Sequence, residues 1–334
     1  MPTDFRDGRT YPRRGRQTIG EALWLLRMAD KGRAAAAGTI HDYIYPCPMD
    51  KGVMERWGVT RTEFEAALAA HSDDASLADW LTQHVTAGAI RSANEWLRGE
   101  RAANLDRQDA EEGVTEFVRP DGQRAPGFYA EPERPDGAPG VVLFEEWWGL
   151  TDHVRETAER LAGDGFRVLV PDLYRGRVAA TGDEANHLME GLDFSDAVTQ
   201  DARGAAAYLK AQGSHKVGVL GFCMGGALAM LAAIHDPDFD AAVVFYGFPP
   251  AEAGDPASIR IPVMCHWAVG DEFFNIERVD AIERALEAAG VAHEFHRYDA
   301  KHAFYNPGGL GNYHAEHAET AWARTLEFLR RTLA

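Results

Sequence analysis

The spacing of apolar residues changes once along the chain and divides it into two parts. From residue 17 to about residue 106, apolar positions recur at the spacing of one helix face. Two of these amphipathic stretches, 76–85 and 89–100, are expected to bury Trp80, Leu81, Trp96 and Leu97. The pattern therefore predicts an all-α domain over residues 17–106.

Helix-start signals add detail to this first part. Thr18 followed by Glu21 has the capping-box pattern and predicts a helix over Ile19–Met28. Thr60 and Thr62 are two further candidate N-caps, and the sequence leaves the choice between them open.

Prolines and charged residues mark the irregular segments. Tyr43–Asp50 holds two prolines around Cys47 and is expected to be a loop or turn. Residues 107–113 are interpreted as a polar linker, and residues 1–16 as a basic, flexible tail.

From residue 114 onward, short apolar runs rich in valine alternate with helical stretches. Runs that are apolar on both faces are typical of buried parallel strands. The runs expected to be strands are GVVLFEE, RVLVPD, KVGVLGF, AAVVFYG, PVMCHWA and AHEFHRYD. The alternation predicts a doubly wound, mostly parallel α/β sheet over residues 114–334, with its chemistry at the carboxyl ends of the strands.

Composition and charge restrict the class of partner. The chain has 334 residues, 46% of them hydrophobic, and a net charge of −18 that argues against nucleic acid or an anionic membrane as partner. Residues 1–36 differ, because eight Lys and Arg there face four Asp and Glu, a balance of +4. We interpret this segment as solvated, with a polyanion-binding arm as the alternative.

Cysteine content and hydropathy indicate the compartment. No apolar run approaches the ~20 residues of a membrane span, and the first residues lack the apolar core of a signal peptide. The three cysteines, Cys47, Cys223 and Cys265, are far apart, which argues against a disulfide framework. We therefore expect a cytoplasmic protein.

The segment KVGVLGFCMGGALAM carries the first sign of chemistry. It places Cys223 in a Gly-x-Cys-x-Gly turn between an expected strand and an expected helix, where hydrolases have a serine nucleophile. Gly221 and Gly225 permit a tight turn, and the helix N-terminus favours a thiolate. The alternative is that Cys223 is an inert core residue.

Two later strand ends supply partners for a cysteine nucleophile. Asp271 follows PVMCHWA and His302 follows AHEFHRYD, in the chain order of α/β-hydrolase triads. His302 would accept the thiol proton and Asp271 would orient the imidazole. Taken singly, His302 could be a loop residue and Asp271 a turn residue or helix cap. Their joint occurrence with Cys223 favours catalysis.

Residues 114–334 resemble the dienelactone hydrolase family of α/β-hydrolases. The matching segments are VVLFEEWWGL, RVLVPDLYRGR, VGVLGFCMGGALA, HWAVGDEFF and KHAFYN. The resemblance implies a triad of Cys223, His302 and Asp271. It also implies that Glu146, before WWGL, contacts the resting thiol, shifts when substrate binds and helps to generate the thiolate.

The same resemblance implies an oxyanion hole made by the backbone N–H groups of Met224 and Trp147. Family members that act on dienelactone hold its carboxylate with arginines, one of them at the position of Asn306 and another within TGDEANHLMEG. This chain has no arginine at either position, which argues against dienelactone as its substrate.

Aromatic residues near the matching motifs suggest an apolar substrate pocket, with plain core packing as the alternative. The residues expected to line this pocket are Trp148, Phe273, Phe304, Tyr305 and Asn306, with Trp147 and Phe274 as neighbouring aromatics.

The first part of the chain resembles a small helical domain of uncharacterised function, through LWLLRMADKGRAAAAGTIHDYIYPCPMD. Its Asp30, Lys31, Tyr43 and Cys47 could form a site, but we expect solvated polar residues and a core cysteine. In the second part, His314 and His317 have the spacing of two ligands on one helix face without an evident third. We expect neither a metal nor a cofactor.

These observations together predict a carboxylic-ester hydrolase of the carboxymethylenebutenolidase type. It would cleave a small-molecule ester or lactone through an acyl-cysteine intermediate. Two alternatives stay open: a thioesterase or other acyl hydrolase on the same triad, and a catalytically idle protein that binds a partner or senses redox state through Cys223. The sequence does not indicate the oligomeric state.

Overall fold

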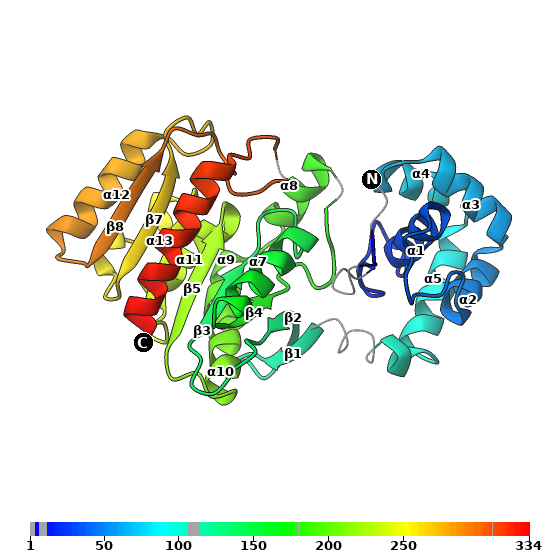
Figure 1. The fold of residues 1–334 in the computed structure, drawn as a ribbon, viewed down its shortest axis with the longest axis horizontal. Helices are drawn as coiled ribbons and strands as arrows, with labels where there is room; N and C mark the ends of the chain where they lie inside the picture. The colour runs from blue at the N-terminus through cyan, green and yellow to red at the C-terminus, as the bar shows by residue number, and fades with distance from the viewer. Residues whose placement is uncertain (1–3, 7–11, 106–113, 180, 309) are drawn as a thin grey trace. The chain divides into compact units, whose positions relative to one another are not determined.

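The computed structural model describes residues 4–6, 12–105, 114–179, 181–308 and 310–334. The chain divides into two compact units (Figure 1). The first unit comprises Met1–Val114 and Gly176–Ala185, and the second comprises Thr115–Arg175 and Asn186–Ala334. The expected linker 107–113 lies outside the described residues.

The first unit is helical, as predicted. Its described helices are α1 (Leu25–Ala37), α2 (Pro48–Trp57), α3 (Arg61–Ala70), α4 (Asp74–His84) and α5 (Ala87–Arg98). They enclose one apolar core, whose buried members include Trp24, Met28, Phe64, Leu77, Leu81, Trp96 and Leu97. Trp80 is only partly buried and packs against this core from outside.

The predicted helix over Ile19–Met28 is wrong at its start. Helix α1 begins later, directly after Trp24, which adopts a left-handed conformation with φ of 71°. Thr18 does not cap a helix, because its N–H donates to the carbonyl of Gly176 at 3.1 Å. The capping-box pattern of Thr18 and Glu21 therefore did not identify a helix start.

Of the two candidate caps in the later segment, Thr60 is the N-cap. Its hydroxyl accepts from the backbone N–H of Glu63, whose carboxylate accepts from the N–H of Thr60. Thr62 lies inside α3. The expected loop Tyr43–Asp50 is shorter than predicted, because α2 begins at Pro48, at the position where a helix tolerates proline.

The described part of the expected flexible tail is packed. Phe5 is fully buried and meets Tyr43 edge to face, with ring centroids 5.2 Å apart. Arg13 forms ion pairs with Asp30, at 2.6 Å, and with Asp74. The expectation of a loose, solvated tail is wrong for these two residues, because Phe5 packs on Tyr43 and Arg13 pairs with two carboxylates of the helical unit.

The second unit contains an eight-stranded sheet with the order β1-β2-β4-β3-β5-β6-β7-β8. The strands are β1 (Val114–Val118), β2 (Arg124–Ala130), β3 (Gly140–Phe144), β4 (Arg167–Pro171), β5 (Val217–Phe222), β6 (Ala241–Phe245), β7 (Val263–Ala268) and β8 (His293–Tyr298). Strands β2 and β4 are antiparallel, and the pairs from β4 to β8 are parallel. The doubly wound, mostly parallel α/β sheet is confirmed.

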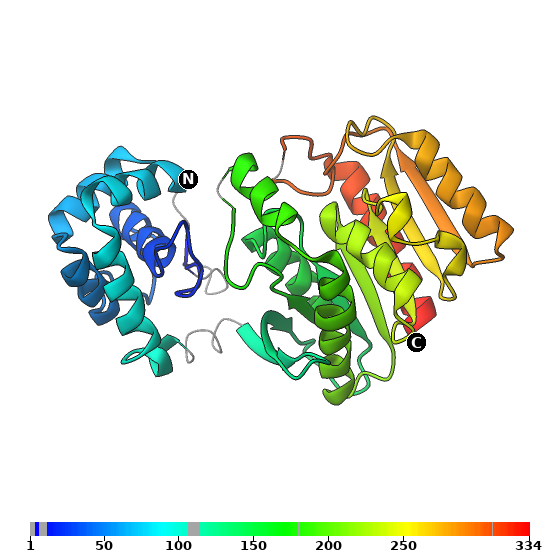
Figure 2. The same cartoon turned by 180° about the vertical axis from the view of Figure 1, so that it is seen from behind.

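Helices cover both faces of this sheet. Helices α7 (Asp152–Gly163) and α13 (Ala315–Leu333) lie over one face (Figure 1), and α10 (Arg203–Ala211) and α11 (Met224–His235) lie over the other (Figure 2). The remaining elements are α8 (Gly182–Glu190), α9 (Phe194–Asp196), the π-helix Ala197–Ala202, two short 3₁₀ turns (Ala251–Ala253 and Pro256–Ser258) and α12 (Ile276–Ala288).

The sheet brings the expected chemistry to one edge. All six apolar runs form strands, and β3 to β7 are completely buried, as parallel strands covered on both faces should be. Because β3, β5, β6, β7 and β8 are adjacent and parallel, the loops after them emerge side by side. Within the described ranges, no helix combines the length and apolar character needed to cross a membrane.

Candidate active site

Cys223 occupies the sharp turn between β5 and α11. Its backbone has φ of 56° and ψ of −116°, a strained conformation for a residue with a side chain. A Cβ atom on Gly221 would lie 2.0 Å from the carbonyl oxygen of Gly225, and one on Gly225 would lie 2.5 Å from that of Glu145. The two glycines are therefore required by close backbone packing around the cysteine.

Cys223, His302 and Asp271 form a connected chain. The Sγ atom lies 3.0 Å from Nε2 of His302, and Nδ1 of the same ring lies 2.8 Å from Oδ2 of Asp271. The other oxygen of Asp271 accepts from the backbone N–H groups of Phe273 and Phe274 at 2.8 and 3.0 Å. Because a carboxylate only accepts, Nδ1 carries the proton and Nε2 can accept the proton of the thiol.

Glu146 is buried beside this chain. Its carboxylate accepts from the Asn306 amide and, at 3.5 Å, from the hydroxyl of Tyr246. Burial raises the pKa of Glu146, and the bond from Asn306 offsets part of that rise. Asn306, which the sequence predicted to line the pocket, therefore contacts Glu146 directly. It stands at the position where the family resemblance implies an arginine in members that cleave dienelactone.

The thiol of Cys223 rests in the environment of a neutral group. Burial raises the pKa of Cys223 above its usual value, and the nearby charges of Glu146 and Asp271 raise it further. A hydrogen bond from the backbone N–H of Met224 acts in the opposite direction. These surroundings favour the neutral thiol of Cys223 over the thiolate, and removing the nearby negative charges would favour ionisation.

A buried tyrosine connects the two residues whose amides are expected to form the oxyanion hole. The hydroxyl of Tyr174 donates to the carbonyl of Trp147 at 3.1 Å and lies 3.3 Å from Sδ of Met224. Burial raises the pKa of Tyr174, and the charges of Glu145 and Cys223 add to the rise. The hydroxyl is therefore a neutral donor placed between the two loops.

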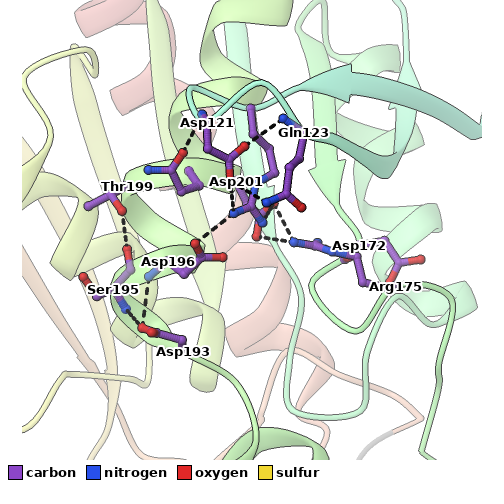
Figure 3. A network of polar contacts seen from close by, with 11 residues as sticks. Asp121, Gln123, Asp172, Arg175, Asp193, Ser195, Asp196, Thr199 and Asp201 are labelled. Carbon is purple, nitrogen blue, oxygen red and sulfur yellow. Dashed lines mark hydrogen bonds and ion pairs between the residues drawn. The ribbon is translucent and has the colours of Figure 1, made fainter.

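An ion pair fixes the turn that carries Tyr174 (Figure 3). Arg175 donates to both carboxylate oxygens of Asp201, at 2.9 and 2.8 Å, and to the carbonyl of Asp172 at 2.8 Å. Asp201 is buried in the π-helix Ala197–Ala202. Arg175 itself has φ of 55°, and the paired contacts hold this unfavourable conformation.

Of the expected pocket residues, Phe273 lies at the exposed side of the site and Trp148 lies beside Trp147. Phe273 is 64% exposed, and its ring centroid lies 4.9 Å from that of His302. Trp148 is partly buried and meets Trp147 edge to face at 5.1 Å. The Phe273 side chain is therefore accessible to a molecule that approaches His302.

The structure places Phe304 and Tyr305 in the core instead. Phe304 is fully buried beside Tyr246 and Tyr298, and Tyr305 stacks on Phe222 at 4.9 Å. Both belong to the apolar cluster that joins the sheet to α13. Core packing, the alternative left open for the aromatics, describes these two positions.

The two histidines of NYHAEHAE stack on each other at the start of α13, with ring centroids 3.9 Å apart. His314 is the N-cap of α13, and its Nδ1 accepts from the backbone N–H of His317 at 3.4 Å. Within the part of the chain that the structure describes, no group of three or more His, Cys, Asp or Glu side chains is arranged to hold a metal ion.

Comparison with known families decides the classification. Residues 125–333 match the dienelactone hydrolase family, and residues 9–124 match a domain of unknown function, DUF5069. The chain belongs to the dienelactone hydrolase family. The resemblance inferred from the motifs is therefore confirmed for both parts of the chain.

Named relatives agree with this classification. Protein usf of Aquifex pyrophilus is 34% identical over 230 residues, covering 66% of this chain and 98% of the relative. A candidate carboxymethylenebutenolidase of Aquifex aeolicus is 31% identical over 230 residues, with coverage of 66% and 98%. The structure of a candidate dienelactone hydrolase from Klebsiella pneumoniae matches with a TM-score of 0.59 and 26% identity, over 65% of this chain and 98% of that one. The second unit is thus a hydrolase of the dienelactone hydrolase type.

Tyr174 and Tyr246 contact expected site residues of this dienelactone hydrolase family member and were not predicted from the sequence. Both follow the carboxyl ends of parallel strands, Tyr174 after β4 and Tyr246 after β6. The strand-end rule that identified Asp271 and His302 could have identified them as well.

Proposed function

We propose that this protein hydrolyses a carboxylic ester or lactone through an acyl-cysteine intermediate on Cys223. The observation that carries the proposal is the unbroken chain from Sγ of Cys223 through His302 to Asp271, with contacts of 3.0 and 2.8 Å. In this mechanism the thiolate attacks the carbonyl carbon, and His302 protonates the departing alcohol oxygen. Water, deprotonated by the same imidazole, then releases the acid and restores the thiol.

Glu146 would control when the thiolate forms. Its charge is one cause of the raised pKa of Cys223, so moving the carboxylate away from the sulfur favours ionisation. A substrate that competes for the amide of Asn306 would detach Glu146 from its partner. The thiolate would then form chiefly when substrate is present, which protects the cysteine from oxidation between turnovers.

The oxyanion of the tetrahedral intermediate would bind the backbone N–H groups of Met224 and Trp147. Support comes from the Met224 amide, which hydrogen-bonds the sulfur and lies at the N-terminus of α11. Fixed backbone donors of this kind contribute about 3 kcal/mol each to similar reactions. Asp271 would keep the imidazole in the required tautomer throughout.

The substrate class follows from what surrounds the triad. Asn306 is neutral and Phe273 is exposed over the His302 ring, so an apolar acyl or alcohol group suits the site better than the free carboxylate of dienelactone. A thioester has the same carbonyl chemistry and remains the alternative substrate. The structure of a dienelactone hydrolase-like promiscuous phosphotriesterase matches this chain with 26% identity and a TM-score of 0.59, so a phosphotriester belongs in the substrate panel.

The test is turnover of aryl esters, lactones, thioesters and a phosphotriester by the wild type and by Cys223→Ala. We expect carboxylic-ester or lactone turnover in the wild type and its loss in the variant. Equal turnover by both proteins would refute the mechanism. A preference for thioesters in kcat/KM would retain the triad and replace the substrate. Alkylation of Cys223 without any turnover would favour the redox-sensing alternative.

A further inference from the structure

Lys31 and Cys47 form a contact in the helical unit that hydrolysis does not use. Lys31 lies on α1 and its side chain is only 3% exposed. Cys47 is the N-cap of α2, and its sulfur lies 3.2 Å from Nζ of Lys31. The pair therefore places an amine nitrogen within van der Waals distance of a thiol sulfur.

Asp50 fixes this amine in position. Both of its carboxylate oxygens accept from Nζ of Lys31 at 2.8 Å. The same carboxylate accepts from Nε1 of Trp24 and from the backbone N–H of Cys47, both at 2.8 Å. Asp50 is fully buried, and a buried ion pair gives little net stability, so stability alone is a poor reason for this arrangement. A carboxylate at this distance can also accept a proton from the amine.

Solvent exposure distinguishes Cys47 from Cys265, the other cysteine that does not belong to the proposed triad. Cys47 is partly exposed, whereas Cys265 is completely buried in β7. Oxidation of cysteine depends on access to the sulfur, so a peroxide reaches Cys47 more readily than Cys265. Cys265 can therefore serve as the internal control when the oxidation of Cys47 by peroxide is measured.

We propose that Lys31 and Cys47 are a modification site, at which a peroxide produces a covalent nitrogen–sulfur bond. Peroxide first oxidises the thiol to a sulfenic acid and is itself reduced to water. The amine of Lys31, after giving its proton to Asp50, attacks the sulfur and expels hydroxide, which takes up that proton to become water. The sum is R–NH₂ + R′–SH + H₂O₂ → R–NH–S–R′ + 2 H₂O. A second peroxide could insert one oxygen and release one more water, giving R–NH–O–S–R′.

The bond would join α1 to the start of α2. Its two ends are 16 positions apart in sequence, so it closes a loop in the unfolded chain and stabilises the folded helical unit. Reduction by a thiol would break it and restore both side chains. The site is independent of Cys223, and its test does not depend on hydrolase activity.

The experiment treats the full-length chain with hydrogen peroxide, blocks remaining thiols with N-ethylmaleimide and digests the protein with trypsin. A modified Lys31 resists trypsin, so the expected product joins residues 28–33 to residues 34–51. Its mass should be about 2 Da below the sum of the two free peptides, or about 14 Da above it with an inserted oxygen. Either product supports the proposal, and dithiothreitol should abolish both.

Variants separate this bond from general oxidation. Lys31→Arg keeps a cation beside Asp50 but lacks a nucleophilic amine, so the linked peptide should be lost while Cys47 still oxidises. Cys47→Ser should lose the linked peptide, and Cys265→Ser should retain it. The wild-type digest alone can overturn the proposal. Cys47 recovered as sulfinic acid beside a normally cleaved Lys31, or left as a thiol as unreactive as Cys265, would do so.

Discussion

Replacing Tyr174 by phenylalanine tests whether the proposed oxyanion hole depends on the Tyr174 hydroxyl to hold the backbone of Trp147 and Met224 in place. The substitution removes one oxygen and keeps the ring, so the buried space remains filled. It deletes the 3.1 Å hydrogen bond to the carbonyl of Trp147 and the 3.3 Å contact with Sδ of Met224. Both residues then lose the contact that fixes their loops relative to each other.

The expected loss follows from that one bond. A neutral hydrogen bond contributes about 0.5–1.5 kcal/mol, and the same loss in the transition state lowers kcat by about twofold to twelvefold. KM should change little, because the carbonyl of the bound ester does not yet carry the charge that the amides stabilise. Tyr174 is a positioning residue in this account, since its hydroxyl acts through Trp147 and Met224.

The assay is steady-state ester hydrolysis with kcat and KM measured separately, together with the rate of iodoacetamide alkylation of Cys223. Alkylation develops no oxyanion, so its rate should stay close to that of the wild type while kcat falls. Tyr208→Phe is the matched control, because that hydroxyl bonds Thr115 at 3.3 Å, away from the triad. An unchanged kcat in Tyr174→Phe, or an equal fall in the control, would refute the role given to Tyr174.

Further results are expected from three substitutions. Glu146→Gln removes a charge that raises the pKa of Cys223, so the pH profile of its alkylation should move to lower pH, and an unmoved profile would contradict the role of Glu146. Burial raises the pKa of Glu146 above its ordinary value of 4.5, so the folded state holds the carboxyl proton more tightly than the unfolded chain does. The resulting contribution to the free energy of unfolding is complete below pH 4.5 and is lost as the pH rises through the folded-state pKa. Glutamine does not ionise, so Glu146→Gln lacks this pH dependence. When the pH is raised above 4.5, the free energy of unfolding measured in urea should therefore fall less in the variant than in the wild type. Gly221→Ala should lower the unfolding free energy by about 3 kcal/mol, because its Cβ would meet the Gly225 carbonyl at 2.0 Å. Gly163→Ala, which meets nothing within 4 Å in α7, should instead raise it by about 0.5–1 kcal/mol, as urea unfolding would show.

The strands and the positions of Cys223, Asp271 and His302 could be predicted because they depend on local pattern. Buried parallel strands are apolar throughout, and Cys223 and Asp271 each follow such a run. His302 follows β8, which is only partly buried but lies beside β7 in the same sheet. Once the runs are assigned to one parallel sheet, their carboxyl ends must share an edge. The sequence therefore predicted which residues would meet without predicting any distance between them.

Contacts between distant segments could not be predicted in the same way. The Glu146–Asn306 bond joins residues 160 positions apart, and neither position signals the other. The helix start was misplaced for a similar reason, because the backbone of Thr18 is bonded to Gly176, far along the chain. Phe304 was assigned to the pocket because aromatic residues suit both pockets and cores, and only the packing around α13 separates the two.

The acyl-cysteine intermediate on Cys223 can be trapped directly. The enzyme is mixed with p-nitrophenyl acetate, quenched in acid within the first turnovers and digested for mass spectrometry. We predict an acetyl group, about 42 Da, on the peptide that contains Cys223, accompanying a burst of p-nitrophenol. Ester turnover with no acyl group on Cys223, or with the group on another residue, would contradict the central claim.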